Sequence, residues 1–288
     1  MISSDIKRLK IKANAKINLT LAITGKREDG YHLLDTVMQS VSLGDTVFLK
    51  KADNISVKCR GVDIPEVDNI AFKAAKLFFS ETGIKGGVLI KIKKQIPDAA
   101  GMGGGSADAA AVLVGLNRIY GANLSTEKLE QMALELGADV PFFIRGGTMR
   151  AEGIGEILTE LKPFLKGYFV LVKEGKKPST KEMYNLVDNE NPPMPDNESF
   201  INALENGDLD KASGYFENSF NIVWKENTLP KKLIDLGAVS ASLSGSGPTY
   251  FGWFKDEKTA KAAFKSMKKG NKKVYLVKPL NCGLEIFE

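Results

Sequence analysis

The chain has 288 residues, of which 43% are hydrophobic and 26% are charged, and its formal net charge at pH 7 is +5. This composition is typical of a globular protein and excludes a disordered or fibrous chain, and the length allows two domains. No apolar run is long enough to cross a bilayer, and Cys59 and Cys282 lie too far apart for metal-ligand spacing or a disulfide framework. We therefore expect a cytoplasmic protein without a membrane partner.

Lysine pairs recur along the whole chain instead of gathering in one basic segment. They stand at Lys50-Lys51, Lys93-Lys94, Lys176-Lys177, Lys231-Lys232, Lys268-Lys269 and Lys272-Lys273. A basic chain can bind nucleic acid or a phosphorylated small molecule, but aromatic residues do not alternate with these pairs. The pattern is typical of solvated lysines in loops and at helix ends, so we expect no nucleic-acid partner.

The N-terminal part of the chain predicts strands joined by short turns. Apolar residues occupy every second position from Leu9 to Ile23, while Lys16 and Asn18 fall on the opposite face of the same predicted strand. Glycine-containing segments predict turns between the strands. The expected strands are 9–24, 33–41, 46–50 and 55–59, with turns at 25–30 and at Gly44-Asp45, and together they form a mostly antiparallel meander.

Helices dominate the next segment, interrupted by one strand and a glycine-rich loop. Asp68 is the expected N-cap of the first of these helices. Pro141 suits the first turn of a short helix, which places Asp139 at or just before the start of that helix. The expected elements are a helix over 69–82, a strand over 88–93, a helix ending near Tyr120, a helix capped by Ser125 and ended by Gly137, and a strand over 146–151.

The second half predicts alternating strands and helices. Ser179 and Glu182 match a capping box, which predicts the start of a short helix that carries Tyr184. The remaining expected elements are strands at 168–172, 238–243, 250–254 and 273–277, helices at 197–206, 208–216, 228–236 and 257–269, and a loop at 188–195. We therefore predict an α+β protein with two domains, 1–160 and 161–288.

The segment between the strand 88–93 and the following helix carries the clearest functional signal. It contains Pro97 and the run Gly101-Met102-Gly103-Gly104-Gly105-Ser106. Glycines let a backbone approach a ligand closely, and a helix N-terminus offers unpaired N–H groups and a positive dipole end. This combination predicts a phosphate site. No Lys-Ser or Lys-Thr follows the glycines, so the loop is not a Walker P-loop, and it lacks a dinucleotide context.

Three separated segments carry a family resemblance together. They are Ala15-Lys16-Ile17-Asn18-Leu19, the loop 101–106 and Ser244-Gly245-Ser246-Gly247-Pro248. In this order along the chain they resemble the motifs of the GHMP small-molecule kinases. Two further segments, Arg27 to His32 and Gly137 to Phe142, are similar to the branch of that family that phosphorylates 4-diphosphocytidyl-2-C-methyl-D-erythritol. The resemblance covers nearly the whole chain.

The resemblance implies a fold and a reaction. The implied fold has a ribosomal S5-like N-terminal domain and a ferredoxin-like C-terminal domain, with the active site in the cleft between them. In the implied reaction ATP, accompanied by Mg²⁺, donates its γ-phosphoryl group to the 2-hydroxyl of the cytidine-diphosphate-linked methylerythritol. This reaction belongs to the non-mevalonate route to isoprenoid precursors.

Two residues are candidates for the chemistry. Phosphoryl transfer needs charge stabilisation and an oriented hydroxyl nucleophile. Asp139 is the candidate that accepts the hydroxyl proton, because a carboxylate at a loop-to-helix start can project into a cleft. Lys16 is the candidate that stabilises Asp139, the alkoxide or the transferring phosphoryl group. On the pattern alone, the alternatives are an N-cap role for Asp139 and a surface position for Lys16.

The resemblance assigns the binding of the ATP phosphates to the glycine-rich loop. The implied residues are Pro97, Gly101, Met102, Gly103, Gly104, Gly105 and Ser106. The backbone wraps the phosphates, and the Ser106 hydroxyl contacts a phosphate or the magnesium ion. The alternative is a tight structural turn, which so many glycines disfavour because each costs ordering entropy. The chain departs from the family pattern at Ala107, where a second serine is common, and this leaves the metal ligands open.

The resemblance also implies a cytosine site and a third glycine motif. Tyr31 and Tyr184 are expected to stack on the two faces of the base, and His32 to read its edge. Asn18 is expected to hydrogen-bond the substrate. The third motif consists of Gly245, Ser246 and Gly247, and its alternative role is a hairpin turn. Two other functions stay open: a kinase of the same family that acts on mevalonate, homoserine or a sugar, and a nucleic-acid-binding protein.

Overall fold

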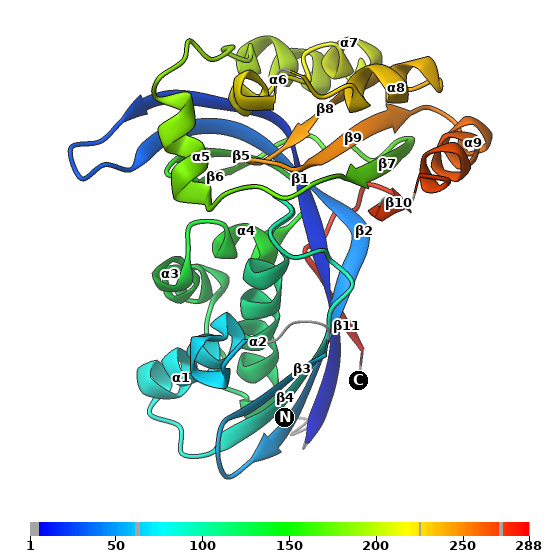
Figure 1. The fold of residues 1–288 in the computed structure, drawn as a ribbon. Coiled ribbons are helices and arrows are strands. Elements are labelled where there is room, and N and C mark those ends of the chain that lie inside the picture. Colours follow the sequence, from blue (N-terminus) through cyan, green and yellow to red (C-terminus); the bar gives the residue numbers. More distant parts are fainter. Residues whose placement is uncertain (1–5, 61–63, 225, 271–272, 288) are drawn as a thin grey trace.

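The computed structural model describes residues 6–60, 64–224, 226–270 and 273–287. Within these ranges the chain forms two β-sheets, each with helices packed against it (Figure 1). Strands β1 (Arg8–Lys26) and β2 (His32–Ala52) pair antiparallel and extend from the lower to the upper half of the molecule. Each helix in the described ranges is too short or too polar to span a membrane.

The first sheet builds the lower half and has the strand order β11-β1-β2-β4-β3, with β5 paired to β2 and β6. Figure 1 shows its helices gathered on one side of the sheet. The further elements of this half are β3 (Ser56–Arg60), the 3-10 helix η1 (Glu66–Asp68), α1 (Ile70–Thr82), β4 (Gly87–Lys93), α2 (Gly104–Tyr120), α3 (Thr126–Leu136), α4 (Val140–Arg145), β5 (Thr148–Gly153), β6 (Ile157–Glu160) and β11 (Leu284–Phe287).

Helix α2 packs tightly on the first sheet because its buried face is built from small residues. Residues 107–111 are all buried, and a Cβ at Gly115 would lie 2.3 Å from Leu49 Cδ1 of β2. Branched strand residues such as Ile11 and Leu49 fill the space that the small residues leave. This packing fixes the N-terminus of α2, and with it the glycine-rich loop, beside β1.

The second sheet builds the upper half and has the antiparallel strand order β10-β7-β9-β8. Its elements are β7 (Tyr168–Lys173), α5 (Thr180–Val187), α6 (Asn197–Glu205), α7 (Leu209–Ser213), the 3-10 helix η2 (Ser219–Trp224), α8 (Leu229–Asp235), β8 (Ser240–Ser244), β9 (Thr249–Phe254), α9 (Glu257–Lys268) and β10 (Lys273–Val277). In the sheet, β7 lies between β10 and β9, and β8 is at the edge beside β9. This order, with helices between β7 and β8 and between β9 and β10, is ferredoxin-like, and it confirms the α+β class.

The β1–β2 hairpin joins the two halves. Its strand β1 is buried on both faces from residue 13 to residue 22. Ile17 and Leu19 pack in one core with Phe169 and Phe251 of the second sheet, whereas Ile11 belongs to the core of the first. Because β1 packs in both hydrophobic cores, it holds the two halves together along one side of the space between them.

The predicted turn at Gly44-Asp45 is wrong, because β2 continues through it. The pairing register shifts between Asn14 and Ala15, so β2 accommodates extra residues as a bulge where a turn was expected. Asp45 points inward and is fully buried. It accepts hydrogen bonds from the backbone N–H groups of Gln95 and Ile96 at 2.5 and 2.9 Å, which is a turn-like polar role inside a strand.

The predicted meander is also wrong, because β3 pairs parallel to β4 at the sheet edge and not with β2. The N-cap of α1 is Asn69, not Asp68, and its side chain accepts a hydrogen bond from the Ala71 N–H at 2.9 Å. β11 is a four-residue strand that was not predicted from the sequence and that returns to pair with β1. The domain boundary near residue 160 stays a prediction, and β11 lies in the first sheet although it follows that boundary.

Candidate active site

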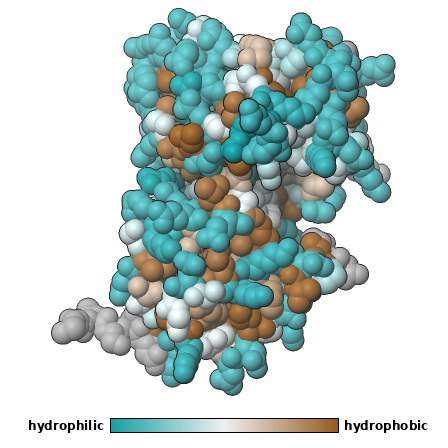
Figure 2. Space-filling view, turned by 90° about the vertical axis from the view of Figure 1, so that its left-hand side faces the viewer, coloured by the Kyte–Doolittle hydropathy of each residue, from teal (hydrophilic) through white to brown (hydrophobic). Residues whose placement is uncertain are grey.

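A cavity of about 1200 Å³ lies between the two halves of the molecule. The glycine-rich loop, the β1–β2 hairpin and the starts of α4 and α5 contribute to its lining. Figure 2 shows the side of the molecule on which α5 lies, with hydrophobic side chains at the narrowing between the upper and lower halves. All residues predicted for the site line this cavity except Gly247, which packs against Trp224.

The glycine-rich loop approaches the third glycine motif so closely that side chains are excluded. Gly101 has a φ of +72°, and a Cβ there would lie 2.3 Å from the Ser244 carbonyl oxygen. The Ser244 hydroxyl donates a hydrogen bond to the Gly101 carbonyl at 3.0 Å and accepts one from the Asn18 N–H at 3.2 Å. Gly103 is the N-cap of α2 and has no side chain to bind the first N–H groups of that helix. The loop therefore combines close packing with N–H groups that can bind an anion.

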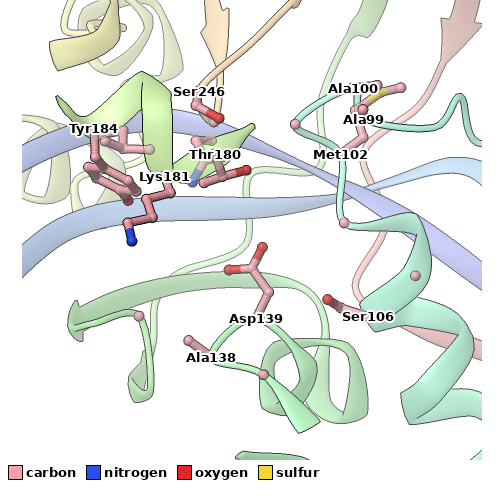
Figure 3. Close-up of a pocket in the computed structure, with 18 of the residues that line it drawn as sticks. Ala99, Ala100, Met102, Ser106, Ala138, Asp139, Thr180, Lys181, Tyr184 and Ser246 are labelled. Carbon is pink, nitrogen blue, oxygen red and sulfur yellow. The ribbon is translucent and has the colours of Figure 1, made fainter. Parts of the chain in front are cut away.

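Asp139 projects from the start of α4 toward the cavity (Figure 3). It occupies the N-cap position, but within the described ranges its carboxylate makes no capping hydrogen bond. The side chain is 41% exposed, and its Oδ2 lies 3.4 Å from Lys16 Nζ. The alternative role as a simple helix cap is therefore excluded, and the carboxylate can accept a proton from a ligand.

Lys16 is held in a buried position on β1 and is only 4% exposed. Its ammonium donates a hydrogen bond to Asn18 Oδ1 at 2.8 Å, and Asn18 Nδ2 donates one to Thr36 Oγ1 at 2.8 Å. The surface-lysine alternative is wrong, because the polar face of β1 lies beneath the cavity and not in bulk solvent. The chain of hydrogen bonds fixes the ammonium beside Asp139.

The three predicted base-binding residues all line the cavity, and two of them, His32 and Tyr184, are in contact; we call this part of the cavity its outer end. Tyr184 of α5 stacks on His32, with ring centroids 4.5 Å apart and an interplanar angle of 16°. Burial, reinforced by the negative charge of Asp139, raises the pKa of Tyr184, so its phenol stays protonated. Tyr31, directly before β2, is 59% exposed. In this structure Tyr184 faces His32, and a base between Tyr31 and Tyr184 stays a prediction.

Asp188, at the C-terminal cap of α5, does not line the cavity but contacts two residues that do, a contact not expected from the sequence. Its carboxylate lies 2.5 Å from His32 Nε2 and 2.5 Å from Lys26 Nζ. The hydrogen bonds from Lys26 and from His32 lower the pKa of Asp188. Asp188 thus ties the end of α5 to the tip of the β1–β2 hairpin. A helix C-cap gives no sequence signal for a contact so distant along the chain.

Lys177 is a second residue that the sequence analysis missed. The prediction of a solvated lysine is wrong here, because Lys177 is half-buried and lines the cavity. Its ammonium donates hydrogen bonds to Ser246 Oγ and, at 3.2 Å, to Thr180 Oγ1. Burial, reinforced by the positive charge of Lys16, lowers the pKa of Lys177. The cavity therefore holds a second ammonium group near Lys16.

Lys94 lies beneath the first turn of α2, where a Cβ at Gly104 would be 3.2 Å from its Nζ. Its ammonium is 2.7 Å from Asp108 Oδ2 and 2.5 Å from Asp45 Oδ2. Two carboxylates thus share one cation in a buried place. Burial, opposed by Lys94 and reinforced by Asp45, raises the pKa of Asp108 to about 7. Although burial alone would lower it, the pKa of Lys94 is raised by the two carboxylates.

The donors around the glycine-rich loop fit a metal ion that arrives with a nucleotide. Within the described residues, no group of three or more His, Cys, Asp or Glu side chains could hold a metal ion by itself. Figure 3 shows the Ser106 hydroxyl on α2 directed toward the side of the cavity where Asp139 lies. Mg²⁺ bound to phosphates needs only one or two protein oxygens, and the Ser106 hydroxyl offers one.

Comparison with known proteins identifies the family. Residues 69–147 match the N-terminal domain of GHMP kinases, and residues 228–273 match their C-terminal domain. A 4-diphosphocytidyl-2-C-methyl-D-erythritol kinase from Clostridium perfringens is 45% identical over 284 residues, which cover 95% of this chain and 99% of that protein. The chain belongs to the GHMP kinase family. As a GHMP kinase it is a small-molecule phosphotransferase that uses ATP.

Solved structures of GHMP kinases share the fold. A 4-(cytidine 5'-diphospho)-2C-methyl-D-erythritol kinase is 31% identical, with a TM-score of 0.76 over 94% of this chain and 98% of that chain. The homoserine kinase from Cytophaga hutchinsonii has a TM-score of 0.81 over 100% of this chain and 99% of that chain, but only 18% identity. A likeness at such low identity shows the fold alone. The predicted GHMP kinase fold is confirmed.

Proposed function

We propose that this GHMP kinase transfers the γ-phosphoryl group of ATP to the 2-hydroxyl of 4-diphosphocytidyl-2-C-methyl-D-erythritol. The observation that carries the proposal is the pair of Asp139 and Lys16, a carboxylate free of capping bonds within the described ranges and a buried ammonium 3.4 Å away. The pair lies in one cavity with the glycine-rich loop and with Tyr31, His32 and Tyr184. The identity of 45% to a relative with that name supports the choice of acceptor.

In the proposed mechanism Asp139 orients the acceptor hydroxyl and accepts its proton as the oxygen attacks the γ-phosphorus. The bond between this phosphorus and the ADP oxygen breaks, and ADP leaves with the electron pair. Lys16 stabilises the negative charge that gathers around the transferring group. Because Asn18 already holds the Lys16 ammonium, this charge is in place before the reaction begins.

The glycine-rich loop is the proposed phosphate site for ATP. The backbone N–H groups of Gly101 to Ser106 bind the phosphate oxygens, supported by the positive end of the 17-residue helix α2. Pro97 and Met102 shape the loop, and Gly245 and Ser246 line the cavity beside it. The Ser106 hydroxyl is the protein group that would hold Mg²⁺ together with the phosphates. When bound, this ion neutralises phosphate charge.

The outer end of the cavity is the proposed cytosine site. The base stacks on Tyr31 and Tyr184, and His32 reads its edge. Asn18 hydrogen-bonds the part of the acceptor that lies near Lys16. We further propose the division into domains 1–160 and 161–288, with β11 added to the first sheet, and a cytoplasmic location stays a prediction.

The test is magnesium-dependent release of ADP from ATP with several acceptors in parallel. The acceptors are 4-diphosphocytidyl-2-C-methyl-D-erythritol, mevalonate, homoserine and galactose. We expect turnover with the cytidine compound alone. Turnover with another acceptor, without the cytidine compound, would keep the kinase and overturn the cytosine site. The homoserine arm is informative because a homoserine kinase shares this fold at 18% identity.

A further inference from the structure

Lys177 lies on the segment between β7 and α5 and lines the cavity. Its ammonium bridges two elements, because it donates hydrogen bonds to Ser246 of the third glycine motif and to Thr180 at the start of α5. Figure 3 shows Thr180 and Ser246 on the same side of the cavity, across from Asp139. The ammonium is thus held in place by hydroxyl groups before any ligand arrives.

The charge of the Lys177 ammonium is not balanced by any carboxylate that the structure describes. Within the part of the chain that the structure describes, Lys177 forms no ion pair with a carboxylate, and its partners are neutral hydroxyls. Its pKa is lowered by burial and by the neighbouring Lys16, so both effects act against the charge. Two nearby ammonium groups in a partly buried place are costly unless an anion joins them. The arrangement therefore fits a ligand with negative charge at this point.

The position of Lys177 lies between the base site and the reacting pair. Thr180 is one helical turn before Tyr184 on α5, so the two share a helix face. Ser246 follows Gly245, which packs against Gly101 of the glycine-rich loop. In the proposed acceptor, a diphosphate separates the cytidine from the erythritol that carries the reacting hydroxyl. With the base at Tyr184 and the hydroxyl at Asp139, this diphosphate passes Lys177.

We propose that Lys177 binds the diphosphate of the acceptor substrate, an inference that rests on the proposed function. Ser246 and Thr180 hold the ammonium so that its third N–H group points to a phosphate oxygen of the substrate. Such a bond between two charged groups is strong when it is shielded from water. By binding the diphosphate, Lys177 positions the acceptor hydroxyl beside Asp139. Lys16 instead stabilises the phosphoryl group that is transferred.

The test compares Lys177→Gln with Lys176→Gln in the full chain. Lys176 is exposed and adjacent, so this control removes the same charge from a place outside the cavity lining. Calorimetry with CDP and with cytidine measures affinity without turnover, and only CDP carries the diphosphate. We expect Lys177→Gln to weaken CDP about tenfold to a hundredfold and cytidine less than about twofold. Lys176→Gln should leave both affinities unchanged.

Steady-state kinetics of the Lys177 variants provide a second readout. Lys177→Gln should raise the KM for the acceptor more than the KM for ATP, and Lys177→Arg should retain most of the CDP affinity. Unchanged CDP affinity, or equal losses for CDP and cytidine, would overturn the inference. If the wild-type protein binds CDP through Lys177 but turns over no cytidine acceptor, the proposed function fails and the diphosphate contact stands. If it turns over that acceptor and Lys177→Gln still binds CDP normally, only this inference fails.

Discussion

Asp139 and Lys16 differ most in their exposure, and this difference suits their proposed tasks. Lys16 is 4% exposed and held by Asn18, so its charge needs no reorganisation when negative charge develops. The side chain of Asp139 is 41% exposed, so it can pass a proton on to solvent after accepting it. In the proposed mechanism the Lys16 ammonium therefore acts from a fixed position, whereas Asp139 exchanges its proton with solvent.

Asp139→Asn should remove the proton acceptor and leave the binding surfaces intact. We expect kcat to fall about 10²- to 10⁴-fold, the usual contribution of a positioned acid or base. Affinities for ATP and the acceptor should stay within about threefold, because the asparagine amide has the same shape as the carboxylate. Steady-state kinetics with separate binding measurements check this. A variant that retains kcat within tenfold would remove Asp139 from the role of base.

The same substitution should not weaken the fold. The Asp139 side chain makes no capping hydrogen bond within the described ranges, so α4 does not depend on it. Thermal unfolding of Asp139→Asn is the control, and we expect a midpoint close to that of the wild type. A large drop would mean that lost activity reflects lost structure.

At the scale of elements, the glycine-rich loop is built against the turn between β8 and β9. The Ser244 hydroxyl connects the two, because it donates to the Gly101 carbonyl and accepts from the Asn18 N–H. The first sheet, the loop and the second sheet are thus joined at one serine. The proposed phosphate site depends on this contact for its shape.

Gly101→Ala should break that contact. The new Cβ would lie 2.3 Å from the Ser244 carbonyl oxygen, which is backbone and cannot rotate away, and the φ of +72° is unfavourable for alanine. We expect the free energy of unfolding to fall by about 3 kcal/mol or more. Denaturant titration checks this value.

Gly105→Ala is the matched control in the same loop. A Cβ at Gly105 meets only Ile70 Cγ2 at 3.6 Å, and Gly105 lies in the first turn of α2. Alanine is the better helix former, so we expect unchanged or slightly higher stability, by up to about 1 kcal/mol. Equal stability of the two variants would show that the loop is not docked on Ser244 in solution.

Asp188 connects α5 with the hairpin tip, and its removal should loosen the outer end of the cavity. Asp188→Asn loses the charged partner of His32 Nε2 and Lys26 Nζ. We expect the KM for the cytidine acceptor to rise about two- to fivefold, as for a partly exposed ion pair, with the KM for ATP and kcat nearly unchanged.

Lys26→Gln serves as the comparison for Asp188, because it removes the ion pair between Lys26 and Asp188 and leaves the contact of Asp188 with His32. Steady-state kinetics should show a smaller rise in acceptor KM than for Asp188→Asn. If Lys26→Gln raises the acceptor KM more than Asp188→Asn does, acceptor binding depends on Lys26. The contact between Asp188 and His32 would then not explain the effect of Asp188→Asn.

The sequence predicted correctly those helix starts that depend on interactions between residues close together in the chain. The capping box at Ser179, the proline at position 141 and the glycines before α2 act within one or two turns of the chain, and these predictions hold. The continuous strand at Asp45 and the roles of Lys177 and Asp188 depend on partners far along the chain. A buried carboxylate that binds the backbone N–H of Gln95 looks, in sequence, like an ordinary turn residue.

At the scale of the whole molecule, the two halves share strands and are not independent. β1 contributes to both hydrophobic cores, and β11 returns from the end of the chain to pair with β1. The cluster of Lys94, Asp45 and Asp108 lies in the first half, where it joins β2, the end of β4 and α2. A change in the charge of this cluster should therefore affect the unfolding of the whole protein.

The sign of this effect follows from the pKa of Asp108. Burial, opposed by Lys94 and reinforced by Asp45, raises this pKa from 3.8 to about 7 in the folded chain. Between pH 3.8 and about pH 7, Asp108 therefore carries a proton in the folded protein but not in the unfolded chain. Stability from this group is fully present below about pH 4 and is lost as the pH rises through about 7. The raised pKa of Lys94 acts only above its ordinary value of 10.5, outside this window.

Asp108→Asn should remove this pH dependence. The wild-type free energy of unfolding should fall by about 1 to 3 kcal/mol between pH 5 and pH 8 relative to the variant, because the buried cluster gains one uncompensated negative charge. The amide oxygen can still accept a hydrogen bond from Lys94, so the variant should match or exceed the wild type at pH 8. Denaturant unfolding of both proteins at a series of pH values measures the difference. Parallel curves would mean that Asp108 is ionised throughout, with Lys94 able to compensate both carboxylates, and a steeper decline in the variant would contradict the assignment.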